Sequence, residues 1–416
     1  MIVEDHPDAI NSEKETPLHR AAATGNLDSC QLLISKGVAI DAINSEKETP
    51  LHMAVQTENL DICQLLISKG AAIDAINSEK ETPLHHAAVT ENLDICQLLI
   101  SEGAAIDAVN SYDQTPLHMA VQTENLDICE LLISKGAAID ATDVLNKTPL
   151  HFAAFCGELQ ACQLLISKGA AIDAIDYKKE TPLHKAVVTK NLNTCELLIS
   201  KGAAIDAIDS WKETPLHMAV VNGNLNISQL LISKGATIDA IDFLNATPLH
   251  YAAFCGELQA CQLLISNGAT IDASNSSNLT PLHIAAQKGH LDVCKLLVSK
   301  GAGVNSLSSN NETPLMLAFF SCTPKDDLVD VVLKLSRHVV RSCETFLIDL
   351  TPRVIFPGYQ FIFKNRLTRR QGGFAVLVKE DISFRRIENL EGSHEEMLFE
   401  VMVTEIGLGK KDVFFA

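Results

Sequence analysis

The sequence predicts a mainly α-helical solenoid of about ten stacked helix-turn-helix units with hairpin loops between them. A tetrad of Thr, Pro, Leu and His recurs every 33 residues, and each copy precedes two short stretches of helical periodicity and a glycine. A fixed period of this length is typical of stacked supersecondary units. We number the repeats 1 to 10 by their tetrads, and the tenth tetrad has Met316 in place of His. The tetrads begin at Thr16, Thr49, Thr82, Thr115, Thr148, Thr181, Thr214, Thr247, Thr280 and Thr313.

Repeat 2 shows why each unit should begin with a short helix, here over residues 50–57. Thr49 can cap the helix with its hydroxyl group, and Pro50 suits the first turn because its missing N–H costs nothing there. Leu51, Ala54 and Val55 then recur at helical spacing, which predicts one apolar face.

A second helix is expected over residues 60–69. Asp61 lies favourably in its first turn, and its apolar side chains are Ile62, Cys63, Leu65, Leu66 and Ile67. Gly70 fits a left-handed cap at its end. Residues 71–80 lack helical periodicity and contain Asn and Ser suited to a turn, so we expect an extended loop.

Two helices this short cannot bury a core alone, so neighbouring units must stack. The 33-residue period, the TPLH tetrad, the following alanine and the LL-x-x-x-G ending resemble the ankyrin repeat family over about residues 8–335. The resemblance implies an ankyrin-repeat solenoid. Two departures from the family concern glycines. At the loop tip, two residues before the tetrad, this chain has Lys, Asp or Asn. Between the helices, four repeats that we expect to be looser have Glu58, Glu91, Glu124 and Lys190.

The pattern predicts four segments. Residues 1–15 form a partial N-terminal loop, so the array should begin without a polar capping repeat. Residues 16–335 form the repeat array, whose degenerate last unit ends in an amphipathic helix over 328–335. A linker over 336–353 then leads to a β-rich tail over 354–416.

Charge limits the possible partners. The chain has 33 basic and 52 acidic residues, and residues 1–320 account for the whole net charge of −19. This disfavours nucleic acid and anionic membranes as partners of the array. The charge indicates either a basic partner surface or a solvated face that keeps the array soluble. The sequence contains no apolar run long enough to span a membrane and no secretory leader. We expect a monomer in the cytoplasm, with the nucleus as the alternative.

The cysteines and histidines predict structural roles. Stacked helices lie about 8–10 Å apart, too far for a disulfide. The repeated cysteines should therefore be core residues in a reducing compartment. The tetrad histidines are a whole repeat apart, so we predict no metal site and no cofactor. The resemblance implies that each bonds the backbone and the tetrad Thr. The eight cysteines at one position of the second helix are Cys30, Cys63, Cys96, Cys129, Cys162, Cys195, Cys261 and Cys294.

Aromatic residues point to a binding surface. Residues 1–318 contain eight, all on loop tips or first helices of repeats 4–8, and aromatic anchors on rigid elements dominate interface energies. Alternatively, Phe152 and Tyr251 wedge between repeats, and Phe155 and Phe254 pack under the next hairpin. We predict a partner-binding groove on the concave face that includes Tyr112, Leu145, Phe152, Phe155, Tyr177, Trp211, Phe243, Leu244, Tyr251 and Phe254.

The tail has a different pattern. Apolar residues alternate from Tyr359 to Phe363, from Phe374 to Val378 and from Met397 to Val403, which predicts three strands. PGYQFIFKNR, RRQGGFAVLV and EMLFEV resemble part of the endonuclease domain of non-LTR retrotransposons. The resemblance implies a fragment that lacks the carboxylate for metal-assisted hydrolysis, so we predict no nuclease activity.

The leading interpretation is a non-catalytic scaffold or adaptor that binds proteins. The first alternative is a truncated ankyrin–nuclease fusion derived from a mobile element, a metal-dependent DNA endonuclease only if a longer form supplies the missing segments. The second is an adaptor that recruits modification machinery, which would need a recruitment motif such as an F-box, and the sequence shows none.

Overall fold

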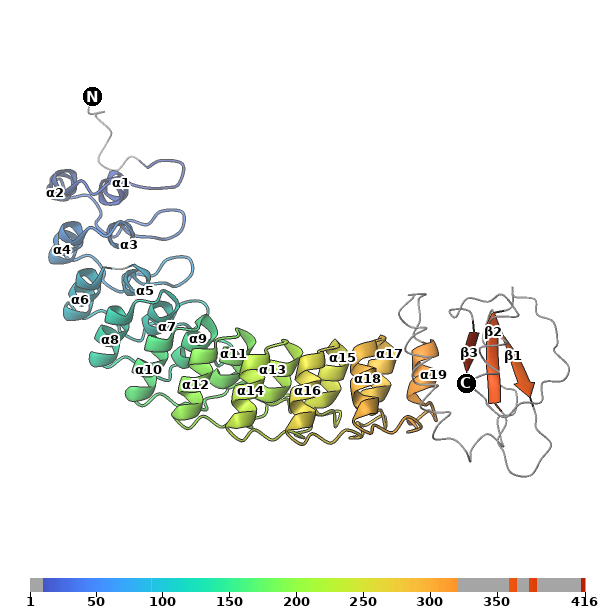
Figure 1. The fold of residues 1–416 in the computed structure, drawn as a ribbon. Coiled ribbons are helices and arrows are strands. Elements are labelled where there is room, and N and C mark those ends of the chain that lie inside the picture. Colours follow the sequence, from blue (N-terminus) through green and yellow to red (C-terminus); the bar gives the residue numbers. More distant parts are fainter. Residues whose placement is uncertain (1–9, 91, 321–358, 365–373, 380–412, 416) are drawn as a thin grey trace. The chain divides into compact units, whose positions relative to one another are not determined.

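The computed structural model describes residues 10–90, 92–320, 359–364, 374–379 and 413–415 (Figure 1). Its contacts divide the chain into two units, Met1–Ala236 and Thr237–Ala416. The first unit contains repeats 1 to 7 as helix pairs: α1 Pro17–Ala23, α2 Leu27–Ser35, α3 Pro50–Gln56, α4 Leu60–Ser68, α5 Pro83–Val89, α6 Leu93–Ser101, α7 Pro116–Gln122, α8 Leu126–Ser134, α9 Pro149–Cys156, α10 Leu159–Ser167, α11 Pro182–Val188, α12 Leu192–Ser200, α13 Pro215–Val221 and α14 Leu225–Ser233.

The second unit continues the same pattern. It holds the helices α15 Pro248–Cys255, α16 Leu258–Ser266, α17 Pro281–Lys288, α18 Leu291–Ser299 and α19 Pro314–Phe320. Within each unit, first helices stack on first helices and second helices on second helices, for example α1 on α3 and α2 on α4. Figure 1 shows these as two parallel rows, with the hairpin loops projecting beside the first helices. The predicted mainly α-helical solenoid is confirmed.

The tetrad fixes the start of each first helix and ties it to the next repeat. His52 Nδ1 accepts a hydrogen bond from Thr49 N at 3.1 Å and lies 2.9 Å from Thr49 Oγ1. Its Nε2 lies 3.2 Å from the carbonyl oxygen of Glu81, one repeat further on. Because Nδ1 accepts from a backbone N–H, Nε2 carries the proton and donates it to that carbonyl. The histidine role that the resemblance implied is confirmed.

The second helix has a cap that the sequence analysis did not identify. Asn59 Oδ1 accepts from Ile62 N at 3.2 Å, an N-cap that satisfies one of the free donors of the first turn. At the other end, Gly70 has φ +89°, as predicted, and Ala71 N donates to Leu66 O at 3.0 Å. These caps confine the helix to residues 60–68.

The core repeats with the sequence. Leu51, Ala54 and Val55 of α3 and Cys63 of α4 are fully buried, and the other seven repeated cysteines are buried and free of disulfides. The core role of this row is confirmed. Ser228 takes the position in repeat 7 and donates to Asn224 O at 2.9 Å, which satisfies its hydroxyl group.

The hairpin loops, which we call fingers, are built by side-chain hydrogen bonds. Asn44 Oδ1 accepts from Glu46 N and Glu48 N, both at 2.9 Å, an Asx turn that folds the tip. Neighbouring fingers join where Ser78 N donates to Glu46 O at 2.7 Å. The ten tip residues adopt left-handed φ although none is glycine: Lys14, Lys47, Lys80, Asp113, Asn146, Lys179, Lys212, Asn245, Asn278 and Asn311.

Some of the acidic residues also have structural roles. Asp41 Oδ1 accepts from Ala72 N of the next repeat at 2.9 Å, and Asp74 Oδ1 accepts from Ala105 N at the same distance. The contact recurs at the same position in later repeats. Part of the negative charge of the array therefore links one repeat to the next.

The turn between the helices differs in one repeat. Glu58, Glu124 and Lys190 adopt the left-handed φ that glycine adopts elsewhere, between +56° and +62°. In repeat 3, Thr90 is extended, with φ −78° and ψ 160°, and Glu91 lies outside the described residues. The looser packing expected of these repeats stays a prediction.

The described part of the tail is an antiparallel sheet. Strand β1 Tyr359–Lys364 pairs with β2 Phe374–Lys379, and β2 pairs with β3 Val413–Phe415. The first two strands were predicted and the last was not. The strand expected near 397–403, the helix over 328–335 and the linker over 336–353 lie outside the described residues. In the parts of the chain that the structure describes, no helix has the length and apolarity needed to cross a membrane.

Candidate protein-binding surface

In the first unit, neighbouring fingers that are joined by backbone hydrogen bonds carry exposed apolar side chains at their tips. We call Tyr112, Val144, Leu145, Tyr177 and Trp211 the tip patch. Val144 N donates to Tyr112 O at 3.0 Å and Tyr177 N to Leu145 O at 2.9 Å, so three of the fingers are directly joined. All five side chains are exposed, with Tyr177 at 53% and Trp211 at 46%. The sequence-predicted tip residues therefore form an accessible surface.

A lysine lies between the two largest rings of this patch. Lys178 Nζ is 5.5 Å from the ring centroid of Tyr177 and 5.7 Å from that of Trp211. The finger of Trp211 is joined to that of Lys178 where Ser210 N donates to Lys178 O at 2.8 Å. An ammonium over aromatic faces is attracted by the ring quadrupole, so Lys178 helps to hold both rings in position.

The first helix of repeat 5, α9, contributes two further predicted residues. Phe155 is exposed, which contradicts the alternative that it packs under the next hairpin. Phe152 is half-buried and meets His118 of the preceding repeat edge to face, with centroids 5.5 Å apart. Phe152 thus packs against its neighbour on one side and offers only part of its ring to a partner.

In the second unit, the finger and the first helix of repeat 8 also carry predicted apolar and aromatic residues. Phe243 and Leu244 are exposed at the tip. Phe254 is exposed as well, with Lys288 Nζ 4.2 Å from its ring centroid, so the hairpin does not cover it. Tyr251 is half-buried, and its hydroxyl group donates to Asp242 Oδ2 at 2.8 Å. This contact with its own finger fixes the Tyr251 ring.

The sequence analysis missed a row of aliphatic side chains on the fingers. One residue before the Asx turn of each finger, six of the seven repeats of the first unit expose a branched aliphatic side chain. Periodicity at 33 residues would have found the row, but a loop residue of this type was not considered. The row consists of Ile10, Ile43, Ile76, Val109, Ile175 and Ile208.

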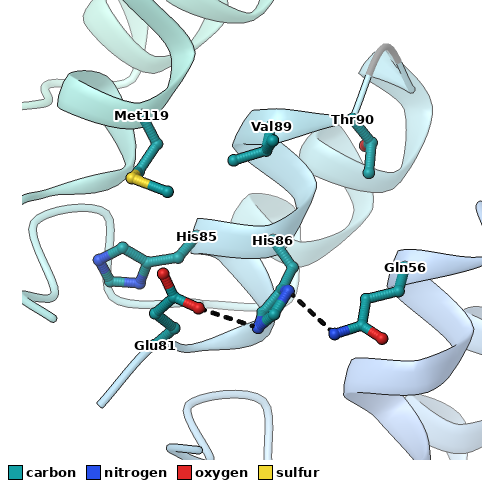
Figure 2. A pocket seen from close by; sticks show the side chains of 7 residues that line it. All are labelled: Gln56, Glu81, His85, His86, Val89, Thr90 and Met119. Carbon is teal, nitrogen blue, oxygen red and sulfur yellow. Dashed lines mark hydrogen bonds and ion pairs between the residues drawn. The ribbon is translucent and has the colours of Figure 1, made fainter. Parts of the chain in front are cut away.

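The sequence analysis also missed a pocket of about 320 Å³ over repeats 2 to 4. Figure 2 shows His86, the residue directly after the tetrad histidine His85, lining the pocket between Glu81 and Gln56, with Met119 contributed by the next repeat. The predicted residues Phe152 and Tyr251 occupy the same repeat position as His86. Extending the search to every type of residue at that position would have identified the pocket.

His86 has polar neighbours at both of its ring nitrogens. Gln56 Nε2 lies 3.2 Å from His86 Nδ1, and Glu81 Oε2 lies 3.4 Å from His86 Nε2. Burial lowers the pKa of His86, although the carboxylates of Glu81, Glu48 and Glu79 oppose this shift. The pocket therefore presents a neutral imidazole beside a carboxylate, with apolar walls from Val89 and Met119.

Over the described residues, no three His, Cys, Asp or Glu side chains are placed to hold a metal ion. Burial raises the pKa of Cys63, Cys96 and Cys129 to about 12, so these thiols stay protonated and inert.

The comparisons with known proteins agree with the repeat architecture. A family model described as "Ankyrin repeats (3 copies)" matches residues 1–77, 69–143, 140–209, 205–275 and 271–339. The comparison with curated proteins gives no match. The family matches cover most of the chain and coincide with the stacked helix pairs, so the chain belongs to the ankyrin repeat family.

Proposed function

We propose that the protein is a non-catalytic scaffold or adaptor that binds another protein through its fingers and first helices. Ankyrin repeats generally mediate protein–protein interactions, and the tip patch carries the proposal for this chain. Tyr and Trp offer large contact areas at a low cost in side-chain entropy. Here they are exposed on fingers whose backbones are joined by hydrogen bonds.

The chemistry of the surface indicates the kind of partner. The tip patch and the aliphatic row are apolar, whereas the array carries the net charge of −19. We therefore propose a partner with an apolar centre and a basic rim. The buried thiols, none of them in a disulfide among the described residues, support the cytoplasmic location that the sequence predicts.

We further propose that the tail is a mobile-element fragment without nuclease activity, on the sequence resemblance alone. Strands β1 and β2 coincide with two of the segments that carry it. A Mg²⁺-dependent nicking assay on plasmid DNA tests this, and cleavage by the purified full chain would favour the ankyrin–nuclease alternative.

Affinity capture with the full chain tests the scaffold role. We expect Trp211→Ala and Tyr177→Ala each to lower the affinity for a captured partner at least tenfold. Truncation of an aromatic anchor that is buried in an interface costs about 2 kcal/mol or more of binding free energy. Leu32→Ala is the matched control, since Leu32 is exposed on α2, in the row of second helices. Unchanged affinity in both aromatic variants would refute the proposed surface.

A further inference from the structure

One pair of positions joins each finger to its own first helix. The Asx residue of the finger and the side chain nine residues later interact in three repeats. Asn77 Nδ2 lies 3.2 Å from His86 Nε2, and Asp176 Oδ2 lies 2.7 Å from Lys185 Nζ. In the second unit, Tyr251 donates to Asp242. In repeats 6 and 8 the helix residue thus donates to the buried Asp carboxylate of the finger.

Repeat 7 breaks this pairing. Asp209 is 2% exposed, and its Oδ1 accepts from Trp211 N and Glu213 N, both at 2.8 Å. Its Oδ2 is enclosed and has no hydrogen-bond partner. The residue nine positions later is Met218, which has no donor group. A buried carboxylate oxygen without a partner is costly and requires an explanation.

Other repeats show how the chain avoids this situation. Where the helix residue is Met53 or Met119, the finger has the neutral residues Asn44 or Asn110. Asn44 Nδ2 then donates to Glu48 Oε2 at 3.0 Å. Asp143 faces Phe152 at the same spacing, but it has no oxygen that is both enclosed and unpartnered. Among the described repeats, repeat 7 alone combines an enclosed carboxylate oxygen that lacks a partner with an apolar side chain nine residues later.

The neighbouring repeat shows what completes such a site. In repeat 6 the ammonium of Lys185 pairs with Asp176 and donates to Glu180. Repeat 7 has Asp209 and Glu213 at the same two positions, but Met218 in place of the lysine. The acceptors are conserved between the two repeats of this chain while the ammonium is missing.

The surroundings of Asp209 suit a cationic side chain with an apolar stem. Trp211 follows Asp209 by two residues and is half exposed in the tip patch. Met218 is 8% exposed and has a flexible thioether chain that can change rotamer. Burial raises the pKa of Asp209 against the effect of the two backbone donors, and the nearby carboxylates of Glu180 and Asp176 add to the rise. A bound cation would stabilise the charged carboxylate of Asp209 against both its burial and the repulsion from these two carboxylates.

We infer that Asp209 is the anchor for a primary ammonium group, a lysine side chain of the partner protein. The lysine enters past Met218, packs its methylene stem beside Trp211 and takes the place that Lys185 holds in repeat 6. The inference rests on the proposed function and adds to it the chemistry of one contact.

The fluorescence of Trp211, the only tryptophan in the chain, gives a direct test on the full-length protein. The probe is n-butylammonium chloride, with sodium chloride at equal ionic strength and 1-butanol as controls. We expect a saturable change with n-butylammonium alone. No saturable change, or the same change with 1-butanol, overturns the inference. A stronger response to n-butylguanidinium overturns the assignment to lysine.

Two variants and one control locate the site. Asp209→Asn reproduces the combination of Asn44 and Met53 that occurs in repeat 2. We expect it to lower the affinity for n-butylammonium at least about tenfold, since a charge-assisted hydrogen bond is lost. Met218→Lys should abolish the response, because the new ammonium occupies the site from within. Met119→Lys should leave it unchanged, since repeat 4 has Asn110. Wild-type affinity in Asp209→Asn or Met218→Lys overturns the inference.

The outcome is separable from that of the proposed function. If Trp211→Ala and Tyr177→Ala lose a captured partner that Asp209→Asn binds at wild-type affinity, the lysine anchor is wrong and the scaffold role stands. If Asp209 binds n-butylammonium but the aromatic variants keep every partner, the ammonium site stands and the proposed tip surface is wrong.

Discussion

Replacing Lys185 by a residue without an amino group should destabilise the array, because the buried carboxylates of Asp176 and Glu180 would lose their cation. Lys185 pairs with Asp176 and Glu180 in repeat 6, and the side chain of Asp176 is fully buried while those of Lys185 and Glu180 are only 11% exposed. Burial opposes ionisation of both Asp176 and Lys185. The pair nevertheless lowers the pKa of Asp176 and raises that of Lys185, so both groups are charged.

The expected loss follows from this burial. Lys185→Met leaves two carboxylates without their cation, and breaking a buried pair from one side costs about 3–5 kcal/mol. Asp176 can take up a proton once the ammonium is gone, which limits the cost, so we expect a loss of about 3 kcal/mol in the free energy of unfolding.

The chain supplies its own control. Asp176→Asn together with Lys185→Met recreates the natural arrangement of repeat 2, where Asn44 Nδ2 donates to Glu48 Oε2 and Met53 follows. We expect the double variant to recover to within about 1 kcal/mol of the wild type, because an apolar and neutral replacement of a buried pair is often close to neutral.

Urea denaturation, followed by Trp211 fluorescence and by far-ultraviolet circular dichroism, measures these differences. Trp211 lies one repeat away from the substitution, so its signal reports the local unfolding of repeats 6 and 7. If Lys185→Met unfolds within 1 kcal/mol of the wild type, or if the double variant is as unstable as the single one, the reasoning about buried charge is refuted.

Three further outcomes are expected. Burial lowers the pKa of His52 and of His184 to about 4. The unfolded chain therefore binds protons first, and each histidine should remove about 1.4 kcal/mol of stability per pH unit as the pH falls from 6.5 towards 4; a stability that is flat over this range in urea titrations contradicts it. Cys156 is exposed and Cys63 fully buried, so iodoacetamide should label Cys156 before Cys63 in the native protein, as mass spectrometry can show. Lys190 has φ +62°, so Lys190→Gly should stabilise the array by about 1 kcal/mol in urea denaturation, and a loss of stability would count against strain at this turn.

The architecture was predictable from the sequence because its determinants are local. The tetrad, the apolar spacing and the closing glycine of one repeat specify two helices and a finger, and the fixed period requires that neighbours stack. The core role of Cys63 and its counterparts follows from the same regularity. The Asn59 cap was also local, and attention to the residue before each second helix would have found it.

The candidate surface was only partly predictable. Aromatic composition identified Tyr177 and Trp211, but not whether Phe155 would be covered, since exposure depends on the next hairpin. The row that includes Ile43 resembles core by residue type. It is exposed because the finger folds around an Asx turn and has neighbouring fingers on its sides rather than on its face.

The sequence by itself determined the repeat, its two helices, the buried cysteine row and the acidic balance of the array. The tertiary structure alone decided which side chains meet across a finger and its helix. Asp176 meets the ammonium of Lys185, whereas Oδ2 of Asp209 has no hydrogen-bond partner, because repeat 7 has Met218 at the position of Lys185. The reason is that hydrogen bonding in the low-dielectric interior depends on contacts between groups nine residues apart, which stacking and the Asx turn bring together.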